Sequence, residues 1–345
     1  EEPDELTTTG IGSFDLRSPQ VAKSDSDYVL PYDLPPHDIF YFDQHLQSLS
    51  RYYDIVSEGR VAIEHSIFPQ GATDSYMLPK PMLYYGNGRS MEEIGARWIE
   101  LIEDAFELAS LDEGGPNFSD FNSFLVIHAG SGHETGELND IRSVFLQTTD
   151  FLQFNGGPLL IGDIQIDSAW ILPESPSRTG RAGLNGLMAK FFGNQLGLPG
   201  MSNFSDGLPA LGGWSLMDVG ANALGFVRRD SLDAVVGFVP PHPMAWSKAQ
   251  LGWIDPLVVV RDTVLSIAAT DRDSQFPRAV RIPINREEYF LLEYRRQRAN
   301  LGAPEGLQVR GVDDEKVLWL DPSQIQFSGD NEGVWLGVDE YDSFI

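Results

Sequence analysis

The sequence predicts an α/β (α+β) fold with a mixed sheet and long helices, followed by a β-rich C-terminal subdomain. Apolar residues recur at helical spacing in stretches before residue 200, whereas short strand-like stretches predominate after about residue 257. Helices and strands that alternate before a run of strands are typical of an α/β main domain with an all-β companion. We therefore expect an extended N-terminal strap over residues 1–36, a main domain over 37–256 and a β-rich subdomain over 257–345.

The first hundred residues contain two amphipathic helices. Residues 1–36 are polar and end in prolines, so we expect little regular structure there. The first helix carries apolar residues at alternating spacings of four and three, and Gly59 ends it. These apolar residues are Phe42, Leu46, Leu49, Tyr53 and Val56. The second helix begins at a capping box, Ser90 followed by Glu93, and extends to about residue 108. Between the two helices, Val61–Ile67 alternates like one face of a strand.

Short apolar stretches predict the strands. Phe124–Ile127 and Leu159–Ile161 are of the buried type, and Ile164–Ile166 extends the second of them. A helix is expected over residues 184–196. The strands predicted after residue 257 are Leu257–Val260, Val264–Ile267, Ala279–Ile284, Tyr289–Tyr294 and Lys316–Leu320.

The composition excludes several classes of function. The net charge of −27 argues against nucleic acid as a partner, because phosphate binding needs clustered Lys and Arg. The absence of cysteine excludes disulfides, thiolate metal sites and cysteine catalysis. No apolar run approaches the roughly 18 residues of a membrane helix, so we predict no membrane span. The chain begins at Glu1 rather than Met, and we expect that an upstream segment has been removed.

Residues Lys190–Gly200 have the frame of a zinc-protease helix without its metal ligands. In the H-E-x-x-H motif, two His at i and i+4 bind Zn²⁺ and Glu is the general base. The extended motif adds a turn glycine and a third ligand. Here Lys190 and Asn194 occupy the two His positions. Phe191 stands at the Glu position and Gly200 at that of the third ligand, while the turn glycine, Gly197, is present.

Seven further stretches occur in the same order as in one known family. They are Leu49–Gly59, Met82–Gly86, Val126–Thr135, Ile171–Glu174, Gly213–Asp218, Trp246–Pro256 and Glu288–Arg295. Together with the helix they resemble the immune inhibitor A family of secreted zinc metallopeptidases, over most of the chain. The resemblance implies a metzincin-like pseudo-peptidase domain over residues 37–256. It also implies that Trp214 and Met217 belong to a Met-turn, which in active members lies beneath the zinc, and that they frame a cleft with Gly197 and Pro199.

The departure from the family is complete at the metal. Zinc needs an imidazole, a thiolate or a carboxylate, and the four positions offer an amine, a phenyl ring, an amide and a hydrogen. We therefore expect no zinc and no peptide hydrolysis at this helix. Two interpretations of Lys190 stay open. It is either a solvated residue on a helix that has lost its function, or an ammonium in the vacated zinc position, which requires a carboxylate partner.

Other ion sites have weaker support in the sequence. His128, His133 and Glu134 surround a glycine turn and are the only histidine-containing candidates for a metal site, although their spacing matches no recognised ligand pattern. Calcium is a candidate ion because hard oxygen ligands suit it. The acidic stretches that qualify are Asp25–Asp27, Asp271–Asp273 and Asp330–Asp342. None of them has the calcium-loop pattern of an EF-hand, which favours solvated surface loops.

These observations predict a catalytically inactive, metallopeptidase-like protein that is secreted, extracellular or at the cell surface. It would serve as a binding or structural module, with a protein or peptide in its cleft or with further copies in a surface assembly. The alternative is an active secreted zinc endopeptidase with non-standard ligands. The chain stops at Ile345, where members of the family continue into further strands, so we expect a longer native chain.

Overall fold

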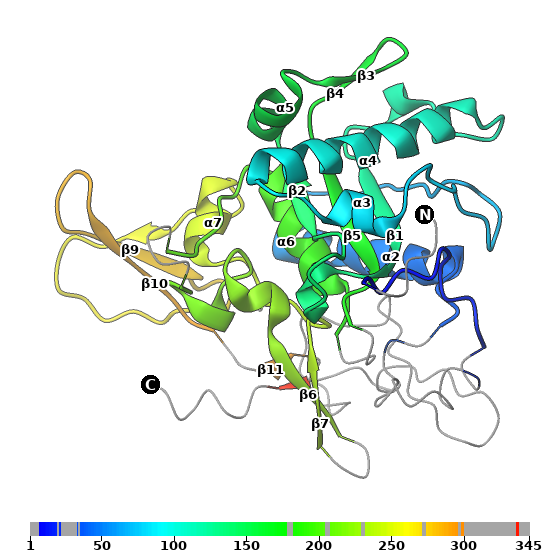
Figure 1. The fold of residues 1–345 in the computed structure, drawn as a ribbon. Coiled ribbons are helices and arrows are strands. Elements are labelled where there is room, and N and C mark those ends of the chain that lie inside the picture. Colours follow the sequence, from blue (N-terminus) through cyan, green and yellow to red (C-terminus); the bar gives the residue numbers. More distant parts are fainter. Residues whose placement is uncertain are drawn as a thin grey trace. The chain divides into compact units, whose positions relative to one another are not determined.

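The chain is a mixed α/β protein with small mixed sheets and several helices, as the sequence predicts (Figure 1). The computed structural model describes residues 7–18, 21, 33, 35–177, 182–203, 208–228, 232–270, 274–295, 298–299 and 336–337. Two compact units are distinguished: unit 1 comprises residues 1–44 and 65–183, and unit 2 comprises residues 45–64 and 184–345. The domain boundaries expected at residues 36 and 256 stay predictions.

Unit 1 is built on a three-stranded sheet with the order β1-β5-β2. Strand β5 (Ala169–Ser175) is parallel to β1 (Leu125–Ser131) and antiparallel to β2 (Val144–Leu146). All seven residues of β5 are buried, because it is the central strand. The pairing of β1 with β5 shifts register between His128 and Ser131, opposite Pro173. Proline has no N–H to give to a ladder, so the irregularity falls where a regular ladder would lack a donor.

The core of unit 1 lies between this sheet and α4 (Met91–Leu111). The apolar face of α4 includes Trp98 and Ile102, which are buried with residues of β2, β5 and α5 (Thr148–Asn155). The short helix α3 (Met82–Gly86) contributes Met82 to the same core. Strands β3 (Leu159–Ile161) and β4 (Ile164–Ile166) form an antiparallel hairpin. The expectation that Ile164–Ile166 extends the preceding strand is therefore wrong, since the chain reverses at Gly162, which has a φ of +59°.

The helix cap predicted at Ser90 is present. The Ser90 hydroxyl accepts a hydrogen bond from the N–H of Glu93 at 3.2 Å, and the Glu93 carboxylate accepts one from the N–H of Arg89 at 2.8 Å. We expect Ser90→Ala to lower the free energy of unfolding of unit 1 by about 1 kcal/mol, because an N–H of the first turn loses its acceptor. Ser90→Asp is the matched control, since it retains an acceptor and places a negative charge at the helix N-terminus. Urea unfolding followed through the buried Trp98 measures both, and equal losses in the two variants would contradict the capping role.

Helix α2 (Ile39–Val56) confirms the first predicted helix. The chain leaves it through Glu58 and Gly59, which have φ values of +60° and +76°. The strand predicted at Val61–Ile67 is not formed, although the side chains there do alternate between half-buried and exposed. This segment pairs with no strand among the described residues. Instead, the carbonyl of Ile63 accepts a hydrogen bond from the Ser50 hydroxyl at 2.9 Å.

In its described residues, unit 2 contains short helices and three small sheets or hairpins. Its helices are the end of α2, α6 (Asn185–Gln195), α7 (Ala245–Gln250) and the short 3₁₀ turns Gly212–Trp214 and Val219–Asn222. Strands β6 (Leu224–Arg228) and β7 (Leu232–Val236) pair, as do β11 (Arg298–Ala299) and β12 (Leu336–Gly337). The third sheet has the order β10-β9-β8, formed by Tyr289–Glu293, Ala279–Pro283 and Leu257–Val258.

Three of the five strands predicted after residue 257 are therefore found, in shorter form. The prediction of a strand at Val264–Ile267 is wrong: this stretch has no regular structure, and Val264 is 98% exposed. The predicted strand Lys316–Leu320 lies outside the described residues.

Candidate functional site

The helix predicted over residues 184–196 is present as α6, and it carries Lys190, Phe191 and Asn194. It ends at a glycine turn, where Gly197 has a φ of +94°. The N–H of Leu198 donates to the carbonyl of Gly193 at 2.9 Å, which closes the helix. Lys190 and Asn194 are therefore one turn apart on the same helix, in the arrangement that the H-E-x-x-H pattern requires of its two histidines.

The amine of Lys190 is held inside unit 2. Its Nζ donates to the main-chain carbonyl of Asp218 at 3.0 Å. Burial lowers the pKa of Lys190, and the negative charge of Asp218 opposes this shift. The Asp218 carboxylate is itself engaged, since it accepts hydrogen bonds from the N–H groups of Leu211 and Gly212 at 2.7 and 2.9 Å. Lys190 therefore lies beside a buried carboxylate but is fixed by a main-chain oxygen.

The other altered positions also offer no metal ligand of the usual kind. The side-chain amide of Asn194 donates to the carbonyl of Leu198 at 2.9 Å and so helps to end the helix. Phe191 is buried with 8% of its surface exposed. Gly200 is exposed, and a Cβ placed on it would meet no atom within 4 Å.

The residues expected to frame a cleft are only partly brought together. Met217 is fully buried against α6, where a Cβ added to Gly193 would lie 2.8 Å from its sulfur. Trp214 lies two residues before the buried Leu216, is half-buried, and its carbonyl accepts a hydrogen bond from Arg295. Pro199, by contrast, is exposed. Met217 thus packs against α6 at Gly193, the residue before Asn194. Pro199 lies at the surface.

The residues at these positions do not fit zinc. An ammonium and an amide nitrogen are hydrogen-bond donors without a lone pair for a metal, and phenylalanine and glycine supply no donor atom at all. The amide oxygen of Asn194 is the one remaining candidate, and a single neutral oxygen does not make a zinc site. No hydrolytic step through zinc can be derived from this donor set.

The candidates His128, His133 and Glu134 each contact a different group of the protein. His128 is buried in β1, its Nδ1 lies 2.9 Å from the carbonyl of Ala129, and burial lowers its pKa to about 4. His133 Nδ1 lies 3.3 Å from the carbonyl of Leu138, and Glu134 accepts a hydrogen bond from the N–H of Ser143 at 2.8 Å. In the part of the chain that the structure describes, no three His, Asp or Glu residues are grouped so as to hold a metal ion.

The acidic stretches considered for calcium lie wholly or almost wholly outside the described residues. They are Asp25–Asp27, Asp271–Asp273 and Asp330–Asp342. Calcium binding therefore stays a prediction.

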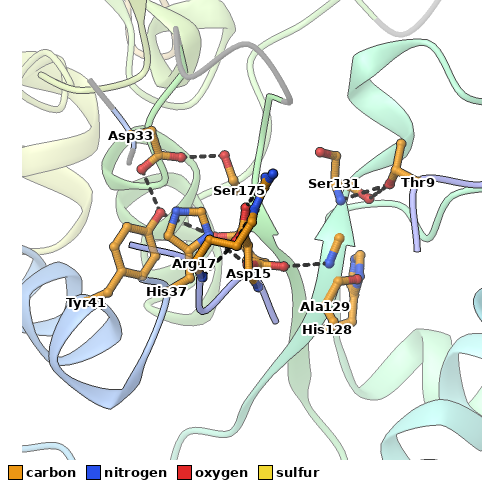
Figure 2. Close-up of polar contacts among 12 residues, drawn as sticks. Thr9, Asp15, Arg17, Asp33, His37, Tyr41, His128, Ala129, Ser131 and Ser175 are labelled. Carbon is orange, nitrogen blue, oxygen red and sulfur yellow. Dashed lines mark hydrogen bonds and ion pairs between the residues drawn. The ribbon is translucent and has the colours of Figure 1, made fainter. Parts of the chain in front are cut away.

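A second polar site, which the sequence did not indicate, lies at the carboxyl ends of β1 and β5 in unit 1 (Figure 2). Glu174 is only 4% exposed, and its carboxylate accepts three hydrogen bonds. The donors are the N–H of Asp15 at 2.5 Å, the N–H of Gly130 at 2.8 Å and the imidazole Nδ1 of His37 at 2.7 Å. The fully buried Asp140 accepts two hydrogen bonds from Thr9, at 2.8 Å from the N–H and at 2.6 Å from the hydroxyl.

A further buried carboxylate, that of Asp33, completes the cluster. It accepts hydrogen bonds from the hydroxyl groups of Tyr41, at 2.7 Å, and Ser175 (Figure 2). Burial by itself would lower the pKa of the neighbouring His37, but its hydrogen bond to Glu174 raises the pKa above the usual value. Ser175 donates to Asp33 and not to an imidazole, so the cluster is not a serine nucleophile with its base.

One signal in the sequence could have revealed this site. Glu174 follows a run of buried apolar residues, and a carboxylate at the carboxyl end of a buried strand is unusual unless it is hydrogen-bonded. In parallel sheets, this end is also where ligands are commonly found. The partners of Glu174 could not be inferred in the same way, because His37 and Asp15 lie more than 130 positions away in the chain.

No protein-family model, curated protein or solved structure matches the chain. Among the described helices, none is both long and apolar enough to cross a membrane.

Proposed function

We propose that this chain is a catalytically inactive, metallopeptidase-like protein, secreted or at the cell surface, that acts as a binding or structural module. The observation that carries the proposal is the pair of hydrogen bonds that Lys190 and Asn194 make. The two side chains lie one turn apart on α6, and each donates a hydrogen bond to a main-chain carbonyl rather than presenting a lone pair to a metal. Met217 packs beneath the same helix turn, where an active relative of the resembled family has its Met-turn.

The proposal includes the metzincin-like scaffold that the resemblance implies. Its support is the order of the elements in unit 2: α6, a glycine turn at Gly197 and then buried Met217. The partner in this proposal is a protein or a peptide, or further copies of the chain. The strongly negative net charge of −27 favours partners that do not need phosphate recognition.

Metal content and hydrolysis test the loss of activity. After incubation with excess Zn²⁺ and removal of free metal, we expect less than one-tenth equivalent of zinc on the protein and no cleavage of casein or of a peptide library. Stoichiometric zinc together with cleavage that a chelator abolishes would contradict the proposal and support an active endopeptidase with non-standard ligands.

Restoring the ligands tests the scaffold separately. We expect the variant Lys190→His/Phe191→Glu/Asn194→His/Gly200→His to bind one equivalent of Zn²⁺, because the spacing on α6 is intact and the surroundings of Gly200 are open. The matched control carries Ala at the same four positions and should bind none. If the histidine variant is folded but binds no more zinc than the control, the metzincin-like arrangement is contradicted.

A further inference from the structure

Residues 7–18, called here the anchored segment, are bound to unit 1 in the manner of a peptide. Their binding site, the carboxylate seat, consists of Asp140 and Glu174 together with Gly130 and Ser131. We propose that the carboxylate seat is a peptide-binding site whose ligand is the anchored segment, held intramolecularly here and exchangeable with the same segment of a second copy of the chain. This inference concerns a different site from the altered zinc helix and does not depend on it.

The contacts define the class of ligand. The seat recognises main-chain N–H groups six positions apart, those of Thr9 and Asp15, through two buried carboxylates. It also recognises one hydroxyl, because Thr9 Oγ1 donates to Asp140 and accepts from the N–H of Ser131 at 2.9 Å. A carboxylate that accepts N–H and O–H donors forms stronger hydrogen bonds than a neutral acceptor does. The ligand is therefore a peptide with a hydroxyl residue near its N-terminal end, and it bends at Gly12, which has a φ of +82°.

Close contacts around Met82 add a steric requirement. A Cβ on Gly10 would lie 3.2 Å from the sulfur of Met82, so alanine there needs a small shift of this side chain and a branched residue needs a larger one. Gly130 has a φ of +83°, and a Cβ there would lie 3.1 Å from Met82 Cε and 3.3 Å from Thr9 Oγ1. The ligand accordingly favours glycine directly after the hydroxyl residue, and the left-handed backbone at position 130 favours glycine in the seat.

The seat needs an occupant. Asp140 and Glu174 are buried, and without the anchored segment they would lose three N–H or O–H donors between them. A buried carboxylate that loses its donors is costly, so the segment is favoured in place. His37 adds to this demand, because its main-chain N–H donates to the carbonyl of Asp15 at 2.8 Å and would lose this acceptor.

The segment itself is not part of the apolar core. Six of its twelve residues are exposed: Thr7, Ile11, Ser13, Leu16, Arg17 and Ser18. Its main aromatic contact is that of Phe14 with Phe42, at 5.3 Å between ring centroids. The binding energy of such a segment rests on a few polar contacts, so it can dissociate while the core of unit 1 stays intact.

A second copy is the occupant that the chain itself supplies. The 14 residues 19–32 connect the segment to Asp33, and a stretch of this length spans up to about 50 Å when extended. Exchange of an identical element between copies requires no new complementary surface, because each seat already fits the segment.

Peptide exchange tests the first part of the proposal. A specific protease site is inserted between Lys23 and Ser24, the folded protein is cleaved and freed of its N-terminal fragment, and a fluorescent peptide of residues 7–18 is added. We expect saturable binding of the peptide. Thr9→Val and Gly10→Val in the peptide should each weaken binding at least about tenfold, because the first removes the hydroxyl bond to Asp140 and the second collides with Met82. Ser13→Ala, at an exposed position, is the matched control and should bind like the parent peptide.

Complementation between copies tests the second part. The donor copy carries Asp140→Asn, which damages its seat but leaves its segment intact. The acceptor copy is cleaved as above and freed of its segment. We expect the two to form a 1:1 complex by light scattering, whereas each alone stays uncomplexed. Circular dichroism verifies that both copies are folded, and Thr9→Val in the donor should abolish the complex.

Each contrary outcome is decisive. If a folded, cleaved protein binds the parent peptide and the Thr9→Val peptide equally, or binds neither, the seat is not a peptide site. If the parent peptide binds specifically but donor and acceptor copies do not associate, exchange between copies is wrong.

Discussion

Replacement of Gly186 by alanine is expected to destabilise unit 2 by about 3 kcal/mol or more. Gly186 is the second residue of α6, and a Cβ placed on it would lie 1.7 Å from the carbonyl oxygen of Ala221. The obstacle is buried main chain and not the end of a flexible side chain, so α6 or the 3₁₀ turn at Val219–Asn222 must move. The gain in helix propensity from glycine to alanine is only about 1 kcal/mol and cannot offset this.

Gly200→Ala provides the control for the Gly186 variant. Gly200 is exposed, its surroundings are open to 4 Å, and its backbone is not in the left-handed region. We expect a change within about 0.5 kcal/mol. Urea unfolding followed by tryptophan fluorescence compares the two, because Trp253 is 4% exposed in unit 2. Equal midpoints for the two variants would show that α6 does not approach Ala221 closely.

Features encoded locally could be predicted from the sequence. The helix α4 was predicted from its apolar spacing and from the Ser90 cap, and both signals lie within one stretch of chain. The frame of α6 was predicted for the same reason, since the spacing from Lys190 to Gly197 determines which residues share a helix face and where the helix ends.

Features that depend on distant partners could not be predicted. The burial alternation of Val61–Ile67 was correct, but a strand also needs a neighbour, and no spacing in the sequence supplies one. The carboxylate seat was missed for a similar reason. Its members come from the end of β1, the end of β5 and the connection between β1 and β2, and only the fold brings Thr9 within 2.6 Å of Asp140.

The proposed function and the inferred seat differ in what the sequence contributed. The proposal of an altered zinc helix rests on a known ligand spacing, which is visible in one line of sequence. The seat has no such motif, since two of the three groups of the anchored segment that its carboxylates accept are main-chain N–H groups, which residue type does not mark. The sequence offers His128, His133 and Glu134 as weak metal candidates, whereas in the structure Gly130 and Ser131, which lie between them, contact the anchored segment.

Lys248 is expected to make the stability of unit 2 depend on pH in the alkaline range. Its side chain is buried in α7, where Nζ donates to Thr270 Oγ1 at 3.0 Å and lies 3.1 Å from His242 Nδ1. Burial lowers the pKa of Lys248 from 10.5 to about 8, and the positive charge of Arg295 adds to this shift. Between these two values the unfolded chain binds more protons than the folded one, so the free energy of unfolding rises with pH across the window.

The matched variant is Lys248→Met, which keeps the length of the side chain but cannot be protonated. We expect the free energy of unfolding of the wild-type chain, relative to that of Lys248→Met, to increase by roughly 2 to 3 kcal/mol between pH 8 and pH 10.5. Burial raises the pKa of Tyr52 and Tyr53, but these phenols are common to both proteins, so their effect cancels in the difference.

Lys80→Met serves as the control for removing an ammonium. Ion pairs with Glu100 and Asp104 hold Lys80, and its pKa is raised, so it stays protonated in both the folded and the unfolded chain through most of this window. Its variant should therefore shift the stability curve by a nearly constant amount below about pH 10. Urea titrations at several pH values measure all three proteins. Parallel curves for the wild type and Lys248→Met would mean that the Lys248 amine keeps its ordinary pKa and is reached by water, because desolvation of the ammonium is the largest cause of the expected divergence.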